Sequence, residues 1–403
     1  MSLALEQLAV HVNRPTQESD RRHAALHLRD WLACVAGGCR SAVADAGRRL
    51  GDPLASAALL GNVMEMDDVH RLARLHPGPV VWPVVVKIAG SRDQLLEAAI
   101  AGYEAMIAVG ETLDDRHYAH WHPTSTAGIV GAAAAAGRVL GLNDERMADA
   151  LGHATSLAGG LWHMRYGDSM TKQVHVLHAY EAGVRCAQVA AAGLTGAHGS
   201  LTGPQGLHEA MCDDPGPLIL GPKWRIHEVS FKGWAACRHA HPAIDAALGA
   251  GRPEGPILVE TYRDALVFCD RPDPATPAEA RFSIQHSVAI ALAHGEPRPE
   301  HYEPPAIAAL APLRDKVRVA EDPAFTARYP AHFGARLTAA GVRVERVDTL
   351  GDPERPLNEA QHRAKLATLC EWGGLEADAP QAAEAAVIAG PHELRALLSG
   401  WLE

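Results

Sequence analysis

Four short segments of this chain combine acidic, imidazole and ammonium side chains in otherwise apolar surroundings. The groups that could do chemistry are Glu65, Asp67, Asp68, His70 and His76; His117, His120 and His122; Lys172 and His175; and Lys232, Cys237, His239 and His241. Histidine can take or deliver a proton near neutral pH, and lysine supplies a positive charge for an anion. The recurrence of the same residue types in four separated segments favours a shared site for proton transfer.

Local spacing supports this interpretation in two of the segments. Lys172 and His175 are three residues apart, so both lie on one face of an expected helix. His122 precedes an expected helix that starts with Thr124, Ser125 and Thr126, where free main-chain N–H groups can face an anion.

Each cluster also has a purely structural interpretation. A histidine beside a helix is more often a hydrogen-bonded structural residue, and a helical lysine usually faces solvent. Lys232, between Phe231 and Trp234, can extend its stem along an apolar wall. Asp67 and Asp68 can simply be the polar end of an apolar, helix-like run.

A metal site is a further alternative. His117, His120 and His122, or His239 and His241, resemble ligand sets because imidazole is a common zinc ligand. Their spacings match no standard site, so the sequence predicts an enzyme without a metal. The chain also has no GxGxxG after a strand, no P-loop, no HExxH and no GxSxG, which gives nucleotide, flavin and triad chemistry no support.

Composition narrows the partners and the compartment. The formal charge of −11 carries no local basic patch, which argues against nucleic acid and anionic membranes as partners. No apolar run reaches about 18 residues, and the first residues lack the pattern of a secretory signal. Seven scattered cysteines without a CxxC pair indicate reduced thiols, so we expect a cytoplasmic protein.

The 403 residues predict two domains. Residues 1–250 are expected to be all helical, with helices over 91–113, 125–141 and 143–161. A Gly/Pro-rich stretch near residue 250 precedes a smaller α+β domain over 251–380, where β-type runs at 257–262, 316–322 and 335–348 surround a helical stretch at 277–295. Residues 381–403 include an amphipathic helix that is expected to return to the helical domain.

The order of these motifs resembles the MmgE/PrpD family, which includes 2-methylcitrate dehydratase, cis-aconitate decarboxylase and iminodisuccinate epimerase. The resemblance rests on "LRDWLACVAGG", "MEMDDVHRLARLHPGPVVWP", "WHPTSTAGIVGAAAAAGRVLGL", "GDSMTKQVH", "FKGWAACRHAHPAIDA", "EARFSIQHSVAIALAHG" and "GDPERPLNEAQHRAK". It covers nearly the whole chain. It implies a cofactor-free homodimeric enzyme with a large all-helical domain and a smaller α+β lid domain.

The resemblance also implies a substrate pocket. Carried over from the family's cis-aconitate decarboxylase, the pocket falls on Glu65, Val69, His76, His122, Lys172, Lys232, Cys237 and His286. Both lysines and two of the three histidines are kept, and Glu65 replaces an aspartate with the same charge. Val69, Cys237 and His286 stand where that enzyme has threonine, histidine and tyrosine, which argues against cis-aconitate as the substrate.

These observations predict a lyase that removes a proton α to a carboxylate of a small di- or tricarboxylate, in the manner of 2-methylcitrate dehydratase. The expected catalytic residues are Asp68, His76, His122, Lys172, Lys232 and His286, and the expected substrate-binding residues are Glu65, His70, Thr124, His175 and Cys237. Epimerisation or decarboxylation of a related acid is the alternative reaction. A non-catalytic carboxylate-binding or scaffold dimer is the alternative of another class.

Overall fold

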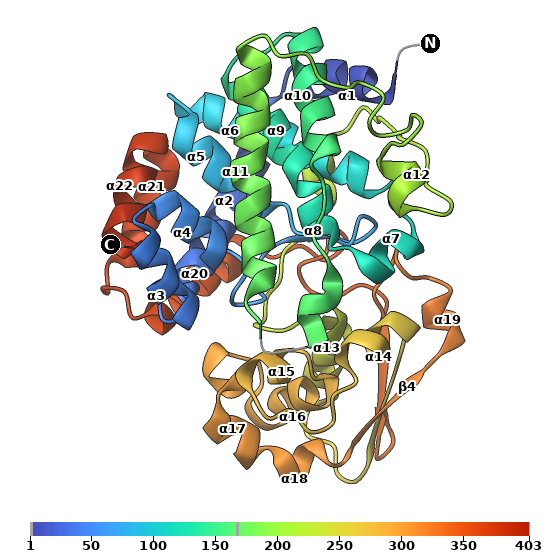
Figure 1. Cartoon of the computed structure of the whole chain (residues 1–403). Helices are drawn as coiled ribbons and strands as arrows, with labels where there is room; N and C mark the ends of the chain where they lie inside the picture. The colour runs from blue at the N-terminus through green and yellow to red at the C-terminus, as the bar shows by residue number, and fades with distance from the viewer. Residues whose placement is uncertain (1–2, 167–168, 403) are drawn as a thin grey trace. The chain divides into compact units, whose positions relative to one another are not determined.

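The computed structural model describes residues 3–166 and 169–402, and it divides the chain into two compact units (Figure 1). Unit 1 consists of residues 1–63, 67–229 and 362–403, and unit 2 of residues 64–66 and 230–361. Each unit is described by itself below. The described part of the chain is mainly helical, with one small mixed sheet.

Unit 1 is built from helices. Its helices are α1 (Ala4–Val12), α2 (Glu18–Gly38), α3 (Ala42–Leu50), α4 (Pro53–Leu60), α5 (Gly78–Ile88), α6 (Arg92–Gly110), α7 (Asp115–His120), α8 (Pro123–Thr126), α9 (Gly128–Val139), α10 (Asp144–Ser156), α11 (Thr171–Ala191), α12 (Leu207–Met211), α21 (Ala379–Ala389) and α22 (Pro391–Leu402). Helix α20 (Glu359–Gly373) begins in unit 2 and continues in unit 1. Unit 1 also contains the short strand β1 (Val69–His70), and the short strand β2 (Val229–Ser230) begins in unit 1 and ends in unit 2.

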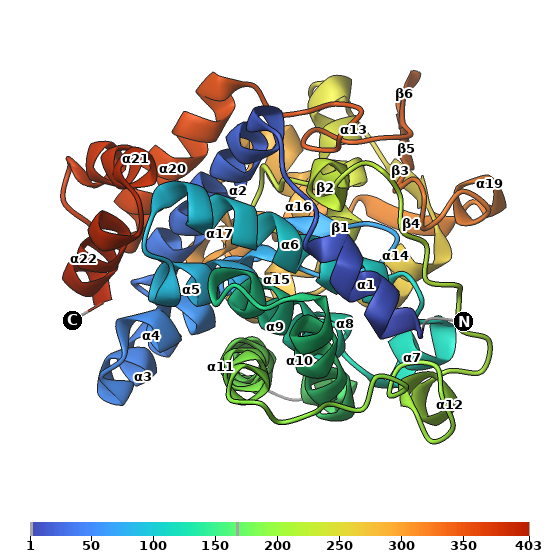
Figure 2. The ribbon, with the colours of Figure 1, turned by 90° about the horizontal axis from the view of Figure 1, so that it is seen from above.

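Helix α9 is the centre of unit 1, and it packs against α6, α10 and α11 (Figure 2). Its residues from Gly128 to Gly137 are all buried, and most are alanine or glycine. Small side chains bring the helix backbones close together, because a Cβ added at Gly102 of α6 would lie 2.9 Å from the Cβ of Ala135. This close packing gives the segments before α9 and α11 a rigid base.

Helix boundaries agree with the sequence in part. Ser91 and Asn143 cap α6 and α10 as expected, each accepting a hydrogen bond from the main-chain N–H three residues on. The helix expected over 125–141 is instead two helices, α8 and α9, that meet at Ala127. The expected helical stretch at 277–295 likewise divides, into α15 and α16.

Unit 2 holds a four-stranded sheet and several helices. The strands are β3 (Ile257–Thr261), β4 (Val317–Glu321), β5 (Ala335–Ala339) and β6 (Val342–Arg346), in the order β4-β3-β5-β6. The helices are α13 (His241–Ala250), α14 (Arg263–Cys269), α15 (Pro277–Arg281), α16 (Ile284–His294), α17 (Pro304–Ala309), α18 (Ala311–Arg314) and α19 (Pro323–Thr326). Strand β3 pairs in parallel with β4 and antiparallel with β5, and β5 and β6 form a hairpin.

The unit boundary differs from the one expected near residue 250. The chain divides between Val229 and Ser230 because α13, which ends at Ala250, packs against α16, β5 and β6. The Gly/Pro-rich stretch that suggested a linker is therefore a loop inside unit 2. Unit 2 ends at Gln361 rather than near residue 380, and the structure groups α21 and α22 with unit 1. Within the described residues, no helix is long and apolar enough to cross a membrane.

Candidate active site

His76 of unit 1 is held in a defined orientation by its neighbours. Its Nδ1 lies 3.0 Å from Oδ2 of Asp67 and 2.9 Å from the main-chain oxygen of Asp68. Both partners are acceptors, so Nδ1 carries the proton and a neutral ring keeps its lone pair on Nε2. The main-chain N–H of His76 donates to Oγ1 of Thr124 at 3.1 Å. The partly exposed His76 ring can therefore act as a base through Nε2.

His122 is buried immediately before α8. Its Nδ1 lies 3.3 Å from Nδ1 of His175 on α11, and its ring centroid lies 4.5 Å from that of Trp162. The main-chain N–H of His122 donates to the carbonyl of Gly160 at 2.8 Å. Gly160 has φ +107°, and a Cβ there would lie 2.6 Å from Oγ of Ser125. Glycine is needed at this position because it allows both the positive φ and the close approach.

The charged groups that act on His122 show which side chains lie near it. Burial, and then the nearby Lys172, His175 and His76, lower the pKa of His122 well below its usual value, with Asp67 opposing. His122 is therefore a neutral hydrogen-bonding group at neutral pH. We call Asp67, His76, His122, Thr124, Lys172 and His175 the histidine–lysine group.

Lys172 lies in the first turn of α11. Ser169 orders the start of this helix, because its Oγ accepts the main-chain N–H of Thr171 at 3.2 Å. Gly167 and Asp168, which begin the same sequence motif, lie outside the described residues.

The sequence suggests Asp68 as catalytic, but its carboxylate oxygens accept hydrogen bonds from groups with a structural role. It accepts hydrogen bonds from the Tyr103 hydroxyl at 2.6 Å, from His27 at 2.8 Å and from the main-chain N–H of Gly78 at 2.9 Å. Burial raises the pKa of Asp68 to about 6, and the bonds from Tyr103 and Gly78 oppose this shift. Asp68 thus fixes the start of α5, whereas its neighbour Asp67 contacts His76.

The glycine of the HPG motif fits the same arrangement. A Cβ at Gly78 would lie 2.7 Å from Oδ1 of Asp68 and 3.1 Å from the Tyr103 hydroxyl. A side chain at this position would displace the carboxylate that anchors the helix.

His70, expected to bind substrate, faces acidic side chains instead of the histidine–lysine group. Its Nδ1 accepts the main-chain N–H of Ala73 at 3.2 Å, which places the ring proton on Nε2. That Nε2 lies 3.8 Å from Glu111 and 3.6 Å from Glu228, and Arg225 donates to Glu111 at 3.0 Å. The arrangement is an ion-pair network. His70, Glu111 and Glu228 are close enough to hold a metal ion, but the His70 nitrogen that faces the carboxylates carries a proton and has no lone pair for a metal.

The histidines that suggested a metal site have separate partners. His117 pairs with Oγ1 of Thr126 at 3.1 Å, whereas His122 faces His175. His239 contacts the Tyr262 hydroxyl at 2.8 Å, and His241 donates to the carbonyl of Ala236 at 3.2 Å. Among the described residues, the other three-residue grouping of His and acids is His332, Asp348 and Glu354 in unit 2.

In unit 2, Glu65 is the centre of a second cluster. Its carboxylate lies 3.8 Å from Nζ of Lys232, whose side chain is fully buried. Cys237 lies near both groups, since its thiol is subject to the charges of Glu65 and Lys232. Glu65 has φ +53°, an unfavourable backbone conformation for a glutamate that is maintained by the surrounding packing.

Arg281 is a further member of this cluster that sequence reasoning missed. The carbonyl of Arg281 accepts the main-chain N–H of Cys237 at 2.8 Å. Burial lowers the pKa of its guanidinium, and the charges of Glu303 and Glu65 oppose this effect. Its Nε is buried without a hydrogen-bond partner in the described part of the chain. A charged residue just before the apolar run of α16 was the available signal. We call Glu65, Lys232, Cys237 and Arg281 the Glu65 group.

His286 has different surroundings in unit 2. Its Nε2 donates to the carbonyl of His301 at 3.0 Å, and its ring meets Tyr302 edge-on at 5.8 Å. Burial lowers the pKa of His286 to about 4, so the ring is neutral at pH 7. Its Nδ1 has no hydrogen-bond partner among the described residues. These contacts do not include the Glu65 group, and a catalytic role for His286 stays a prediction.

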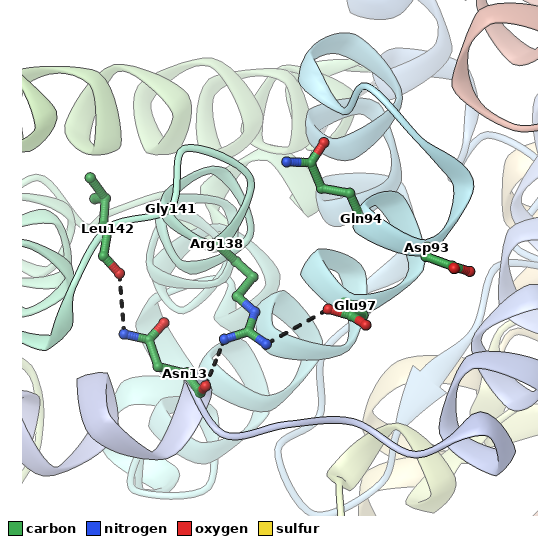
Figure 3. Close-up of a pocket in the computed structure, with 7 residues that line it drawn as sticks. All are labelled: Asn13, Asp93, Gln94, Glu97, Arg138, Gly141 and Leu142. Carbon is green, nitrogen blue, oxygen red and sulfur yellow. Dashed lines mark hydrogen bonds and ion pairs between the residues drawn. The ribbon is translucent and has the colours of Figure 1, made fainter.

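A surface pocket of about 440 Å³ in unit 1 contains none of the predicted site residues (Figure 3). Its lining residues are Asn13, Asp93, Gln94, Glu97, Arg138, Gly141 and Leu142. Arg138 donates to the carbonyl of Asn13 at 2.6 Å and pairs with Glu97 at 3.8 Å. Its charge is thus already compensated by protein groups.

Comparison with known protein families identifies the chain. Residues 52–219 match the MmgE/PrpD N-terminal domain, and residues 234–388 match the MmgE/PrpD C-terminal domain. The protein belongs to the MmgE/PrpD family. The end of the first match and the start of the second lie on either side of the division between Val229 and Ser230.

Similar curated proteins are cis-aconitate decarboxylases. The human enzyme is 28% identical over 259 residues, which is 58% of this chain and 53% of that protein. The Aspergillus terreus enzyme is 29% identical over 236 residues, 52% of this chain and 47% of that protein. A cis-aconitate decarboxylase-like protein of Aspergillus oryzae is 34% identical over 151 residues, 34% of this chain and 30% of that protein. The chain thus matches about half the length of the first two relatives and less of the third.

Proposed function

We propose that this protein is a lyase that acts on a small di- or tricarboxylate by removing a proton α to a carboxylate. The observation that carries the proposal is the orientation of His76, whose Nδ1 faces Asp67 and whose Nε2 keeps its lone pair. Neutral His122 and the ammonium of Lys172 belong to the same cluster. A base next to a fixed positive charge suits this reaction, because the charge stabilises the enediolate that forms as the proton leaves.

The Glu65 group of unit 2 offers a separate place where a carboxylate could bind. Lys232 is a buried cation and Arg281 a largely buried one, so both could bind a carboxylate, and Arg281 has an unused N–H for this purpose.

Dehydration, as in 2-methylcitrate dehydratase, is the reaction we propose. Nε2 of His76 takes the α proton, and the electron pair left on carbon forms the double bond as the β-hydroxyl departs. The imidazolium returns the proton to that hydroxyl, which leaves as water. Neutral His122 would hold the departing oxygen by a hydrogen bond, and no cofactor takes part in the balance.

Decarboxylation is the second candidate, because the similar curated proteins are cis-aconitate decarboxylases. The departures at Val69, Cys237 and His286 argue against cis-aconitate itself as the substrate. A buried thiol is a weaker hydrogen-bond donor than imidazole, so one contact to the acid would be lost at Cys237. Epimerisation would need reprotonation of the same carbon from its other face.

A substrate screen tests the proposal. Purified protein is incubated in D₂O with citrate, 2-methylcitrate, cis-aconitate and aspartate-derived dicarboxylates, and each mixture is followed by proton NMR. We expect interconversion of a hydroxy acid and its unsaturated product, undiminished after treatment with a chelator. Itaconate as the main product would establish decarboxylation instead. No reaction or exchange with any acid would favour the non-catalytic binding or scaffold role.

We also infer that the protein forms a homodimer. Five large apolar side chains near the start of α11 are more than half exposed in the single chain: Leu157, Leu161, Tyr166, Met170 and Val174. Apolar residues concentrated along one segment are typical of a protein–protein interface. Light scattering coupled to size exclusion should give twice the chain mass of 42.8 kDa, and the mass of one chain would contradict this inference.

A further inference from the structure

Asn62 is a fully buried polar residue in the turn that follows helix α4. The helix ends at Leu60, and Gly61 and Asn62 begin the turn. Nδ2 of Asn62 donates a hydrogen bond to Oδ2 of Asp67 at 3.0 Å, and both side chains are buried. Asn62 therefore contacts one member of the histidine–lysine group within unit 1.

The backbone on both sides of Asn62 is held by close contacts. A Cβ at Gly61 would lie 2.8 Å from Nε1 of Trp31, so glycine allows the turn to approach α2. The main-chain N–H of Val63 donates to the carbonyl of Leu60 at 3.1 Å. The Asn62 side chain thus extends from a backbone with little freedom to move.

Asn62 and His76 meet at the same oxygen of Asp67. This oxygen, Oδ2, lies 3.0 Å from Nδ2 of Asn62 and 3.0 Å from Nδ1 of His76. The terminal torsion of an aspartate has a broad range, so the carboxylate alone does not fix which way its oxygens point. A second donor on Oδ2 keeps that oxygen directed at the imidazole ring.

The oxygen of the same amide has no such contact. Oδ1 of Asn62 is buried without a hydrogen-bond partner among the described residues. A buried acceptor that lacks a partner costs stability. The benefit of asparagine at this position therefore lies in its donor, which bonds to Asp67.

A neutral donor suits this position. When Nε2 of His76 takes a proton, the ring becomes an imidazolium, which the negative charge of Asp67 stabilises. A lysine or arginine in place of Asn62 would offset that charge. An amide orients the carboxylate and leaves its charge unchanged.

We propose that Asn62 is a positioning residue that holds Oδ2 of Asp67 against Nδ1 of His76. It thereby keeps the ring proton on Nδ1 and the lone pair on Nε2. The use of this lone pair as a base rests on the proposed function, but the orientation of the ring does not. The two are therefore tested by separate measurements.

The first experiment follows the tautomer of His76. The full-length protein is labelled with ¹⁵N-histidine, long-range ¹H–¹⁵N NMR spectra are recorded, and His76→Gln identifies the His76 signals. We expect the Nδ1–H form in the wild type and a mixture of both tautomers in Asn62→Leu. Asn13→Leu is the matched control, because it removes an amide that donates to Asp144 at 2.8 Å and should keep the wild-type tautomer.

The second experiment is a double-mutant cycle on activity. Asn62→Leu should lower kcat about tenfold with little change in KM, and it should cause no further loss when Asp67→Asn is already present. Asn62→Ala is made alongside it, so that the result does not depend on one variant, and circular dichroism confirms that each is folded.

Three results would overturn the proposal. They are a wild-type His76 with its proton on Nε2, a wild-type tautomer in folded Asn62→Leu or Asn62→Ala, and losses in kcat that multiply in the double variant. The wild-type spectrum needs no variant. A wild type that turns over no acid would instead refute the proposed function, and the tautomer measurement would still decide the role of Asn62.

Discussion

The histidine–lysine group of unit 1 and the Glu65 group of unit 2 are both polar clusters, but they differ in chemistry. The first contains three imidazoles, and the one that faces Asp67 has a defined tautomer with a lone pair on Nε2. The second contains two cations near one carboxylate, and one of them, Lys232, is fully buried. The first group is therefore suited to proton transfer, whereas the second is suited to binding an anionic group.

The largest expected effect is on turnover when His122 is removed. We expect His122→Ala to lower kcat about 10³-fold, because a buried neutral hydrogen-bonding group next to Lys172 is lost from the site of proton transfer. The matched control is His120→Ala, since His120 is exposed two residues away and should keep wild-type kcat. Steady-state kinetics on the substrate found by NMR make the comparison. Equal losses in the two variants would remove the distinction between them.

Two adjacent aspartates separate activity from stability. We expect Asp67→Asn to lower kcat about 10²-fold with little change in KM, because the charge that orients His76 is lost. Asp68→Ala should instead lower the free energy of unfolding by about 3–5 kcal/mol, since it leaves Tyr103 and the N–H of Gly78 without their buried acceptor. Urea denaturation and kinetics on both variants test the division. It fails if Asp68→Ala is as stable as the wild type.

Stability should fall as the pH falls. Burial is the main cause that lowers the pKa of His23 and His27 to about 3 and of His117 and His286 to about 4. Below pH 6.5 the unfolded chain binds protons that these folded rings do not, so stability is lost progressively between pH 6.5 and about 3. The pKa of Asp30 is raised to about 7 and that of Asp68 to about 6, so these two groups stabilise the folded state as the pH falls. They are two carboxyl groups against four imidazoles. Urea midpoints measured from pH 7 to 4 should fall. A constant midpoint would contradict the burial of these imidazoles in the neutral form.

The smallest expected effect is at Cys237. We expect Cys237→Ala to lower kcat/KM less than about tenfold, because a thiol provides a weak contact beside Lys232 and Arg281, which remain. Lys232→Ala is the comparison, since it removes a buried cation. Loss of all turnover in Cys237→Ala would show that the thiol takes part in the reaction, which contradicts its role as a weak contact.

The sequence was informative wherever local chemistry determines structure. Ser91 and Asn143 as caps, the β-type runs that become β3 to β6, and the family motifs could all be predicted from short patterns. The domain boundary was misplaced because Gly/Pro-rich composition marks a loop whether or not two units meet there. The roles of Asp67 and Asp68 could not be separated, because adjacent identical side chains are distinguished only by partners distant in sequence, such as Tyr103 and His27. Arg281 was missed for the same reason, since its interaction with Glu65 joins positions far apart in the chain.

Deuterium exchange and substrate binding, measured on the same variants, test the division between proton transfer and charge most directly. His76→Gln and Lys232→Gln are compared with the wild type in D₂O, with exchange at the α carbon followed by NMR and binding followed by calorimetry. We predict that His76→Gln binds the acid with near-wild-type affinity but loses exchange, whereas Lys232→Gln loses affinity at least about tenfold. Retained exchange in His76→Gln, or unchanged affinity in Lys232→Gln, would contradict the account.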